Sequence, residues 1–380
     1  MTIKNINAFR NNAMRKNIKP LSSLEIAIID DPILKDKSII RLNDINMAVD
    51  FKLKEDYVHN RFIHSMQVAN IIKIMTAYLS EKLGFEIDPR GIFKYAGVFH
   101  DIGHTSFGHQ GEEELNRFLR AKGISYDGNA NNYVALKKSL VLSVFEKEDR
   151  EYILASLAKH FEDLYPEQES EKKIILENIV KDEIFLKDNG IEAYLTQTLA
   201  CMVMDIADEI AYLITDLMDA MNVVSIDEMK RGIQKFCSVD VQNNLIPALE
   251  KGKSEFRAAL NSYTLIFATN FDLVNGKIVY ENKEIEDIRT AFRKINVNLV
   301  LKSNKVIKLQ KKNKKIFKVV FDFFIENEYQ LKDIPSSYYK AKLEVCNDET
   351  KRLMLVRDML GALTDKGLIK IYRKIIRKDI

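Results

Sequence analysis

The feature that most constrains the fold is residues 191–221, the most apolar segment of the chain, which nevertheless carries Asp205, Asp208, Asp216 and Asp219. Burying an unpaired charge is prohibitively costly, so carboxylates on so apolar a helix need partners from elsewhere in the chain. The longest part of this segment without a charge, residues 193–204, is too short to span a bilayer. The segment therefore predicts a buried helix in a protein with no membrane partner.

Helices are predicted elsewhere too, because the 380 residues include only 14 glycines and 6 prolines. Apolar residues recur at helical spacing over 61–83, and Gly84 supplies a stop signal. Asp88 is expected to cap the next helix, with Pro89 at its first position. That helix should run into the His-Asp pair at 100–101 and break at Gly103.

The remaining patterns predict a mainly α fold with a small β element. A polar loop is expected over residues 125–132, and Asn275-Gly276 predicts the turn of a hairpin. Eight lysines lie among apolar residues over 302–318, and residues 350–378 are typical of one or two amphipathic helices. The length allows one large helical domain or two smaller ones.

Composition favours a cytoplasmic protein. The three cysteines, Cys201, Cys237 and Cys346, lie far apart without CxxC spacing, as in reducing compartments. The N-terminal residues are polar and basic, unlike a secretory signal. The net charge of +3 is too small to demand a nucleic-acid or membrane partner.

Histidine usage gives the first indication of chemistry. Five of the six histidines fall within residues 59–109, and three of them belong to the string HDIGHTSFGHQGE at 100–112. Imidazole and carboxylate together suit Mn²⁺, Fe²⁺, Zn²⁺, Ni²⁺ or, less tightly, Mg²⁺. Such a metal acidifies water and polarises phosphoryl oxygens. His100 and Asp101 meet at a helix end, His64 can come from the preceding helix, and either Asp205 or Asp208 can complete the set.

Several strings together resemble the HD-superfamily dNTP triphosphohydrolases of the dGTPase type. They are RFIHS at 61–65, the histidine string at 100–112, GNA at 128–130, DIADEIAY at 205–212 and DMLGALTD at 358–365. The resemblance extends from about residue 40 to 370 and implies an HD-domain helical bundle with additional C-terminal helices. Residues 1–50 would form an N-terminal arm and first helices, residues 51–235 the catalytic core, and residues 236–380 a helical region completing the active site and an oligomer interface.

The resemblance also implies a metal site. His64, His100, Asp101 and Asp208 would hold a divalent ion, with Mn²⁺ or Mg²⁺ expected first and Fe²⁺, Zn²⁺, Ni²⁺ or Co²⁺ as alternatives. Within the string at 205–212, Asp208 and not Asp205 matches the family ligand.

Substrate contacts follow from the same resemblance. Tyr212 and Asp216 share a helix face with Asp208 and would contact the deoxyribose, the alternatives being a core tyrosine and a surface aspartate. Phosphates would be bound by Arg61, whose guanidinium suits them, and by Lys159, which is otherwise a surface lysine. Asn129 is a further candidate. His104, His109 and Glu112 would line the phosphate side, with the His109–Glu112 pair orienting or protonating groups during attack on the α-phosphorus.

The implied reaction is hydrolysis of a dNTP to the deoxynucleoside and inorganic triphosphate, with dGTP as one candidate substrate. Residues 41–49 lack the Lys, Thr and Gln of the family string R-L-x-x-K-T-Q-V, so a base preference is not implied. Thr105-Ser106 replace the usual Pro-Pro, which should loosen that loop modestly.

Two alternatives stay open. Other HD proteins hydrolyse nucleoside monophosphates, cyclic nucleotides or guanosine tetraphosphate. The lysines at 302–318 and the basic end at 369–378 instead favour a nucleic-acid-binding regulatory protein with single-stranded DNA as partner, or an allosteric nucleotide site at a subunit interface. Family members commonly form homo-oligomers, and one is expected here.

Overall fold

The computed structural model describes residues 33, 36–47, 60–137, 139–159, 164–165, 168–222, 224–326 and 347–377. Most of the predicted arm at 1–50, and also His59 and Cys346, lie outside these residues. The described part is mainly α-helical, with a single two-stranded sheet. The predicted fold class is therefore confirmed.

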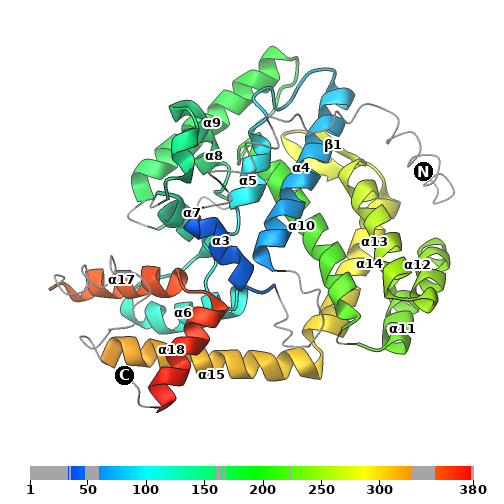
Figure 1. Ribbon diagram of the computed structural model, residues 1–380. Coiled ribbons are helices and arrows are strands. Elements are labelled where there is room, and N and C mark those ends of the chain that lie inside the picture. Colours follow the sequence, from blue (N-terminus) through cyan, green and yellow to red (C-terminus); the bar gives the residue numbers. More distant parts are fainter. Residues whose placement is uncertain are drawn as a thin grey trace.

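A buried helix, α10 (Leu199–Ala220), is the centre of the fold (Figure 1). It packs against α4 (Arg61–Leu83), α5 (Phe93–Phe99) and α13 (Lys253–Ala268). The predicted helix over 191–221 is therefore confirmed, but it starts later than expected. Thr198 is the reason, because its side chain accepts a hydrogen bond from the backbone N–H of Cys201 and caps the helix there.

Helix α4 has the predicted bounds, and Gly84 ends it in the left-handed conformation with φ 79°. The prediction for α5 was half wrong. The Asp88 carboxylate does accept the N–H groups of Ile92 and Phe93, but Pro89 lies in a turn outside the helix. The chain turns there because Gly91 takes a φ of 65°.

The predicted loop at 125–132 was wrong from Gly128 onward, where α7 begins. Asp127 is the reason, since its Oδ1 accepts the N–H of Ala130 and stabilises the first turn. The predicted hairpin is confirmed: β1 (Phe271–Val274) pairs antiparallel with β2 (Lys277–Tyr280), and Asn275 and Gly276 both have positive φ.

The other α-helices are α3 (Lys37–Ile40), α6 (His109–Leu119), α7 (Gly128–Lys137), α8 (Lys147–Ala155), α9 (Glu169–Asp188), α11 (Ile226–Phe236), α12 (Val239–Lys251), α14 (Lys283–Ile295), α15 (Asn304–Glu326), α17 (Glu349–Gly361) and α18 (Asp365–Arg377). Short turns labelled η3 (Arg41–Asp44), η4 (Arg120–Lys122), η5 (Val141–Val144) and η8 (Asn296–Leu301) connect them. No helix among the described residues is long and apolar enough to cross a membrane.

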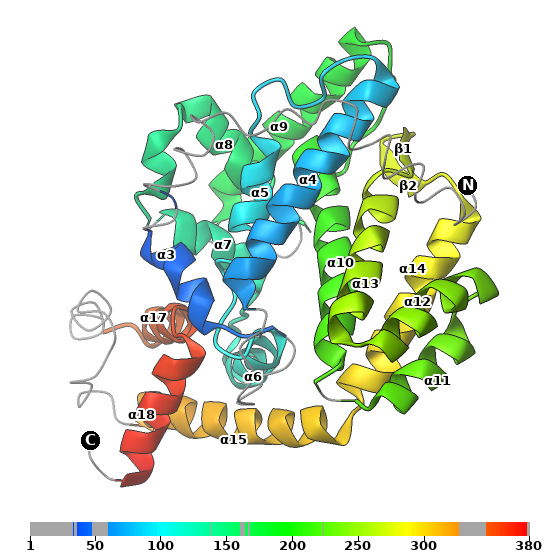
Figure 2. The same cartoon turned by 45° about the vertical axis from the view of Figure 1, so that its right-hand side comes forward.

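The apolar side chains form two clusters. The larger one surrounds α10, and the smaller one joins α6, α15, α17 and α18. Figure 2 shows α15 crossing beneath α6, with α17 and α18 beside it. The predicted amphipathic C-terminal segment thus forms two helices. Of these, α17 packs against α6, the helix that begins at His109, and α18 packs against α15.

Candidate metal and phosphate site

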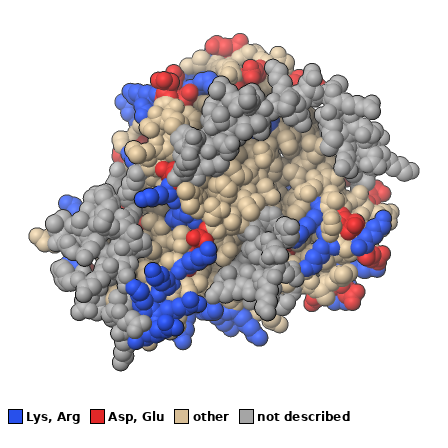
Figure 3. Space-filling model, viewed as in Figure 1, with Lys and Arg blue, Asp and Glu red and all other residues tan. Residues whose placement is uncertain are grey.

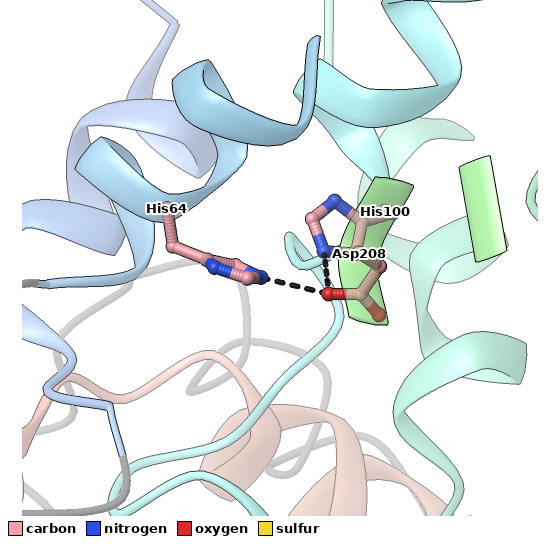
Figure 4. A group of neighbouring side chains, drawn as sticks. All are labelled: His64, His100 and Asp208. Carbon is pink, nitrogen blue, oxygen red and sulfur yellow. Dashed lines mark hydrogen bonds and ion pairs between the residues drawn. The ribbon is translucent and has the colours of Figure 1, made fainter. Parts of the chain in front are cut away.

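Three helices bring the first group of candidate ligands together (Figure 4). His64 projects from α4, His100 from the end of α5 and Asp208 from α10. The Nε2 atoms of His64 and His100 lie 2.8 and 3.4 Å from the same Asp208 Oδ1 atom. Their ligand atoms all lie within 4.8 Å of one another, so one ion could contact all three.

Asp101 lies beside this group. Its Oδ1 atom is 3.5 Å from His100 Nε2, 2.8 Å from Arg61 Nη1 and 3.2 Å from His104 Nε2. Burial disfavours the charge, yet Arg61 and the histidines keep the pKa of Asp101 well below its usual range. The carboxylate is therefore ionised at neutral pH, as a metal ligand must be.

These residues fit a divalent cation. The Oδ2 atom of Asp101 and the Nε2 atom of His100 are buried and make no hydrogen bond with described residues. His100 Nδ1 lies 2.7 Å from the Gly97 carbonyl, which can only accept, so the proton belongs on Nδ1. That tautomer leaves the Nε2 lone pair free to bind a metal.

Lys159 flanks the opposite side of Asp208. Its Nζ lies 2.6 Å from Asp208 Oδ2 and 3.2 Å from Asp205 Oδ1. Burial opposes the charge on Lys159, but the two carboxylates outweigh it and raise its pKa. Asp208 thus offers one oxygen to the histidines and the other to the lysine, whereas the ion-pair partner of Asp205 is the lysine.

A second group lies at the start of α6. The Nδ1 atoms of His104 and His109 are each 3.6 Å from Glu112 Oε2, and Glu112 Oε1 accepts the N–H of Gly128. Despite burial, hydrogen bonds from the two histidines lower the pKa of Glu112. The group can hold a proton between an imidazole and a carboxylate, and its spacing also suits a cation.

Both groups line one cavity of about 650 Å³, a volume typical of small-molecule sites. Cations, carboxylates and imidazoles share its wall with the aromatic ring of Tyr212. The predicted residues on this wall are Arg61, His64, His100, Asp101, His104, His109, Glu112, Asn129, Lys159, Asp208 and Tyr212. Such a wall suits an anionic ligand that carries an organic ring.

Comparison with known proteins identifies a family similarity over the residues that carry the candidate ligands. The HD domain family matches residues 61–213, a range that contains His64, His100, Asp101 and Asp208. Over these residues the chain is similar to the HD domain family. Two relatives over most of its length are deoxyguanosinetriphosphate triphosphohydrolase-like proteins. The one from Vibrio cholerae is 26% identical and the one from Rickettsia peacockii 25%, each match covering 84% of this chain and 80% and 83% of the relative.

Of the predicted site residues, Asp216 alone is not on the cavity wall. It is only 4% exposed, so the alternative of a surface charge is wrong. Burial and the neighbouring Asp216 carboxylate raise the pKa of Tyr212, which places this carboxylate beside the tyrosine hydroxyl. A contact between Asp216 and a sugar stays a prediction.

Sequence patterns missed part of the cavity wall. The additional residues are Met47, Phe107, Gly108, Gln110, Asp127, Gly128, Glu209, Leu301 and Gln310, and Asp205, the alternative to Asp208 as a ligand, also lies on the wall. Leu301 and Gln310 come from η8 and α15, far along the chain from Asp208, the last predicted metal ligand. Gln110 and Gly108 stood inside the histidine string, which was the one signal that could have found them.

Gly108 is required where it stands. Its φ is 56°, and a Cβ atom there would lie 2.6 Å from Nη2 of Arg61. The preceding residue, Phe107, also has a positive φ of 63°, which is costly for a non-glycine residue. The loop that ends at α6 is therefore strained and passes close to the Arg61 guanidinium.

The C-terminal helices hold this loop in place. The hydroxyls of Thr105 and Ser106 donate to the carbonyls of Leu360 and Leu363, at 3.0 and 2.9 Å, and both residues are fully buried. The prediction that Thr105-Ser106 loosens the loop was therefore wrong, because the two hydroxyls tie the loop to Leu360 in the last turn of α17 and to Leu363 just after it.

Arg41 and Asp365 complete these contacts. The Arg41 guanidinium donates to the carbonyls of Ile102, His104, Gly361 and Leu363 at 2.5–3.1 Å. The buried Asp365 carboxylate accepts the N–H of Phe107 at 2.7 Å and two bonds from Asn46 at 3.0 and 3.1 Å. Segments from both ends of the described chain therefore fix the histidine loop.

Proposed function

We propose that this protein hydrolyses deoxynucleoside triphosphates to the deoxynucleoside and inorganic triphosphate. The names of its relatives support the coarser assignment of a phosphohydrolase. The observation that carries the proposal is the cavity itself, where His64, His100 and Asp208 converge and His104, His109 and Glu112 lie on the same wall. The cations of Arg61 and Lys159 line the same cavity.

A divalent ion held by His64, His100, Asp101 and Asp208 would supply Lewis-acid polarisation of a phosphoryl oxygen and lower the pKa of water. The protein's own residues would bind the phosphates and transfer the proton. Arg61, fixed by Asp101, presents its guanidinium to the phosphates. Glu112 orients His109, whose side chain is 79% exposed and is the group best placed to give or take a proton.

Tyr212 would lie against the sugar, which supports a deoxyribonucleotide over a ribonucleotide. Its ring borders the cavity four residues after Asp208 on the same face of α10. A ring packed close to C2′ leaves no room for a hydroxyl. The phosphate role of Lys159 requires its ammonium to contact the substrate while it stays paired with Asp208 and Asp205.

The experiment is to incubate the Mn²⁺-loaded protein with each dNTP and NTP, singly and mixed, and to resolve the phosphate products by ³¹P NMR. We expect inorganic triphosphate from dNTPs, and none from His100→Ala that has a wild-type circular dichroism spectrum. Turnover only in the mixture would indicate an activating nucleotide site. Release of phosphate or pyrophosphate instead would refute the proposal in favour of another HD phosphohydrolase.

A second candidate function is supported by one specific surface. Lysines and arginines gather along the edge formed by α15 and α18 (Figure 3), which pack against each other. Residues 302–318 hold eight lysines and no acid, and residues 366–377 hold five basic residues and no acid. We propose that this surface binds a polyanion such as single-stranded DNA.

Its test is the salt dependence of binding to a labelled oligonucleotide. Neutralising Lys308, Lys311 and Lys315 together should reduce the affinity and the slope against salt concentration, and leave triphosphate release unchanged. Equal affinity before and after this change would refute a nucleic-acid surface.

We also propose that the protein is cytoplasmic, because the buried thiols of Cys201 and Cys237 are free and such thiols stay reduced in that compartment.

A further inference from the structure

Helix α9 has an apolar row on its solvent side. Leu176, Val180 and Ile184 are 52%, 49% and 54% exposed, and their spacing of four residues puts them in one row. The opposite side of the same helix buries Ile175, Ile179 and Leu186. The helix is therefore apolar on two sides, although only one of them meets the core.

This row is unusual for a surface helix. Single exposed apolar residues are ordinary, but a contiguous apolar surface with a polar rim marks a site of interaction. Figure 1 shows α9 at the outer edge of the molecule, far from α15 and α18. A partner could approach the row without covering the cavity.

The charges around the row identify the partner. Glu169 precedes Leu176 by seven residues, and Lys187 follows Val180 by seven, so both lie on the face of the row. Lys173 and Glu183 stand three residues before Leu176 and three after Val180. The sequence of this face is thus acid, base, apolar, acid, base from one end to the other.

Such an order is complementary to itself in reverse. If two α9 helices pack antiparallel with Leu176 opposite Val180, Glu169 of one copy lies opposite Lys187 of the other. The same register puts Lys173 opposite Glu183. A two-fold axis requires this reciprocity. If Glu169 of the first copy lies opposite Lys187 of the second, then Lys187 of the first copy must lie opposite Glu169 of the second.

We propose that two copies of this chain pair, antiparallel, along α9, with Leu176 and Val180 of each copy in contact at the two-fold axis and Ile184 of one copy opposite Lys172 of the other. This inference is independent of the reaction proposed above. One helix pair covers less than the roughly 800 Å² per partner of a standard interface, so the dimer forms reversibly. Neutral apolar contact supplies the attraction, and the charge pairs set the register.

The test is sedimentation velocity of the full chain over a range of protein concentrations. We expect the wild type to shift from monomer to dimer as the concentration rises. At the concentrations where the wild type is a dimer, Val180→Glu should still sediment as a monomer. The matched control is Val239→Glu, since Val239 on α12 is 68% exposed and lies outside the row. It should sediment like the wild type.

A charge exchange tests the register. Glu169→Lys or Lys187→Glu alone places like charges opposite each other and should weaken the dimer, while the double variant restores the pairs and should recover it. Circular dichroism of each variant verifies that the chain is folded. The proposal is overturned if the wild type shows no dimer, if Val180→Glu associates like Val239→Glu, or if the double variant recovers nothing.

Discussion

Asp365 allows the link between the C-terminal helices and the histidine loop to be tested quantitatively. The perturbation is Asp365→Ala beside the milder Asp365→Asn. The carboxylate is 3% exposed as a residue and accepts three hydrogen bonds, one from Phe107 and two from Asn46. Alanine removes all three accepted hydrogen bonds. Asparagine keeps one acceptor oxygen, but its NH₂ group replaces the other oxygen and faces a partner that is itself a hydrogen-bond donor.

The expected cost follows from these bonds. A hydrogen bond to a charged group contributes about 1.5–3 kcal/mol, and a buried donor left without an acceptor costs about 1–3 kcal/mol. Asp365→Asn should therefore lower the free energy of unfolding by about 2 kcal/mol, and Asp365→Ala by about 4 kcal/mol. The positive φ of Phe107 adds strain that only a held loop can retain.

The assay combines urea denaturation with triphosphate release. Relaxation of the loop should displace His104 and His109, and a misplacement of about 1 Å costs about 100-fold in rate. The control is Asp322→Asn, because Asp322 is an exposed aspartate of α15 paired with Lys318 and should change stability by about 0.5 kcal/mol or less. If Asp365→Ala loses stability but keeps the wild-type rate, the loop does not depend on this carboxylate. Stability equal to that of the control would refute the argument from burial.

Three further predictions concern single side chains. Asp208→Ala should abolish metal binding measured by titration calorimetry and also turnover, whereas Asp205→Ala should retain the metal; the reverse result would exchange the two assignments. Gly108→Ala should lower the melting temperature and the rate together, because its Cβ meets the Arg61 guanidinium at a φ of 56°; unchanged kinetics would show that the guanidinium can move freely. Burial raises the pKa of Asp182 to about 6 in the native state. The carboxyl of the unfolded chain ionises near pH 4, so the native state binds the proton more tightly than the unfolded state does. The free energy of unfolding should therefore fall by about 3 kcal/mol as the pH rises from about 4 to 6. In urea denaturation, Asp182→Asn should make the free energy of unfolding less dependent on pH over this range.

Signals that lie close together in sequence predicted the fold well. Helix α4 has its predicted bounds because its apolar spacing and its terminal glycine are both local. The HD pair at 100–101 and the string around Asp208 likewise sit on the elements that present them to one cavity. Pro89 shows the limit of such signals. Asp88 accepts the N–H groups of Ile92 and Phe93 as a cap would, but Pro89 lies in the turn that precedes the helix and not at its first position.

Contacts between distant segments could not be predicted. Arg41 meets carbonyls at Gly361 and Leu363, about 320 residues away, and no pattern near Arg41 indicates this. The substitution of Thr105-Ser106 for a proline pair predicted a looser loop only because the carbonyl partners at the C-terminal end of α17 were unknown. Lys159 was expected to bind phosphate or face solvent. Its ion pairs with Asp205 and Asp208 were not predicted, and its contact with phosphate stays a prediction.

The ties between the histidine loop and residues 360–365 have a consequence for synthesis. A ribosome adds these residues well after His64, His100, Asp101 and Asp208. A nascent chain that ends after α15 contains all four candidate ligands but neither the carbonyl groups nor the carboxylate that hold the loop. Translation order therefore delays the proposed activity until residues 360–365 have been made, and a product truncated after α15 would be able to take up metal without gaining that activity.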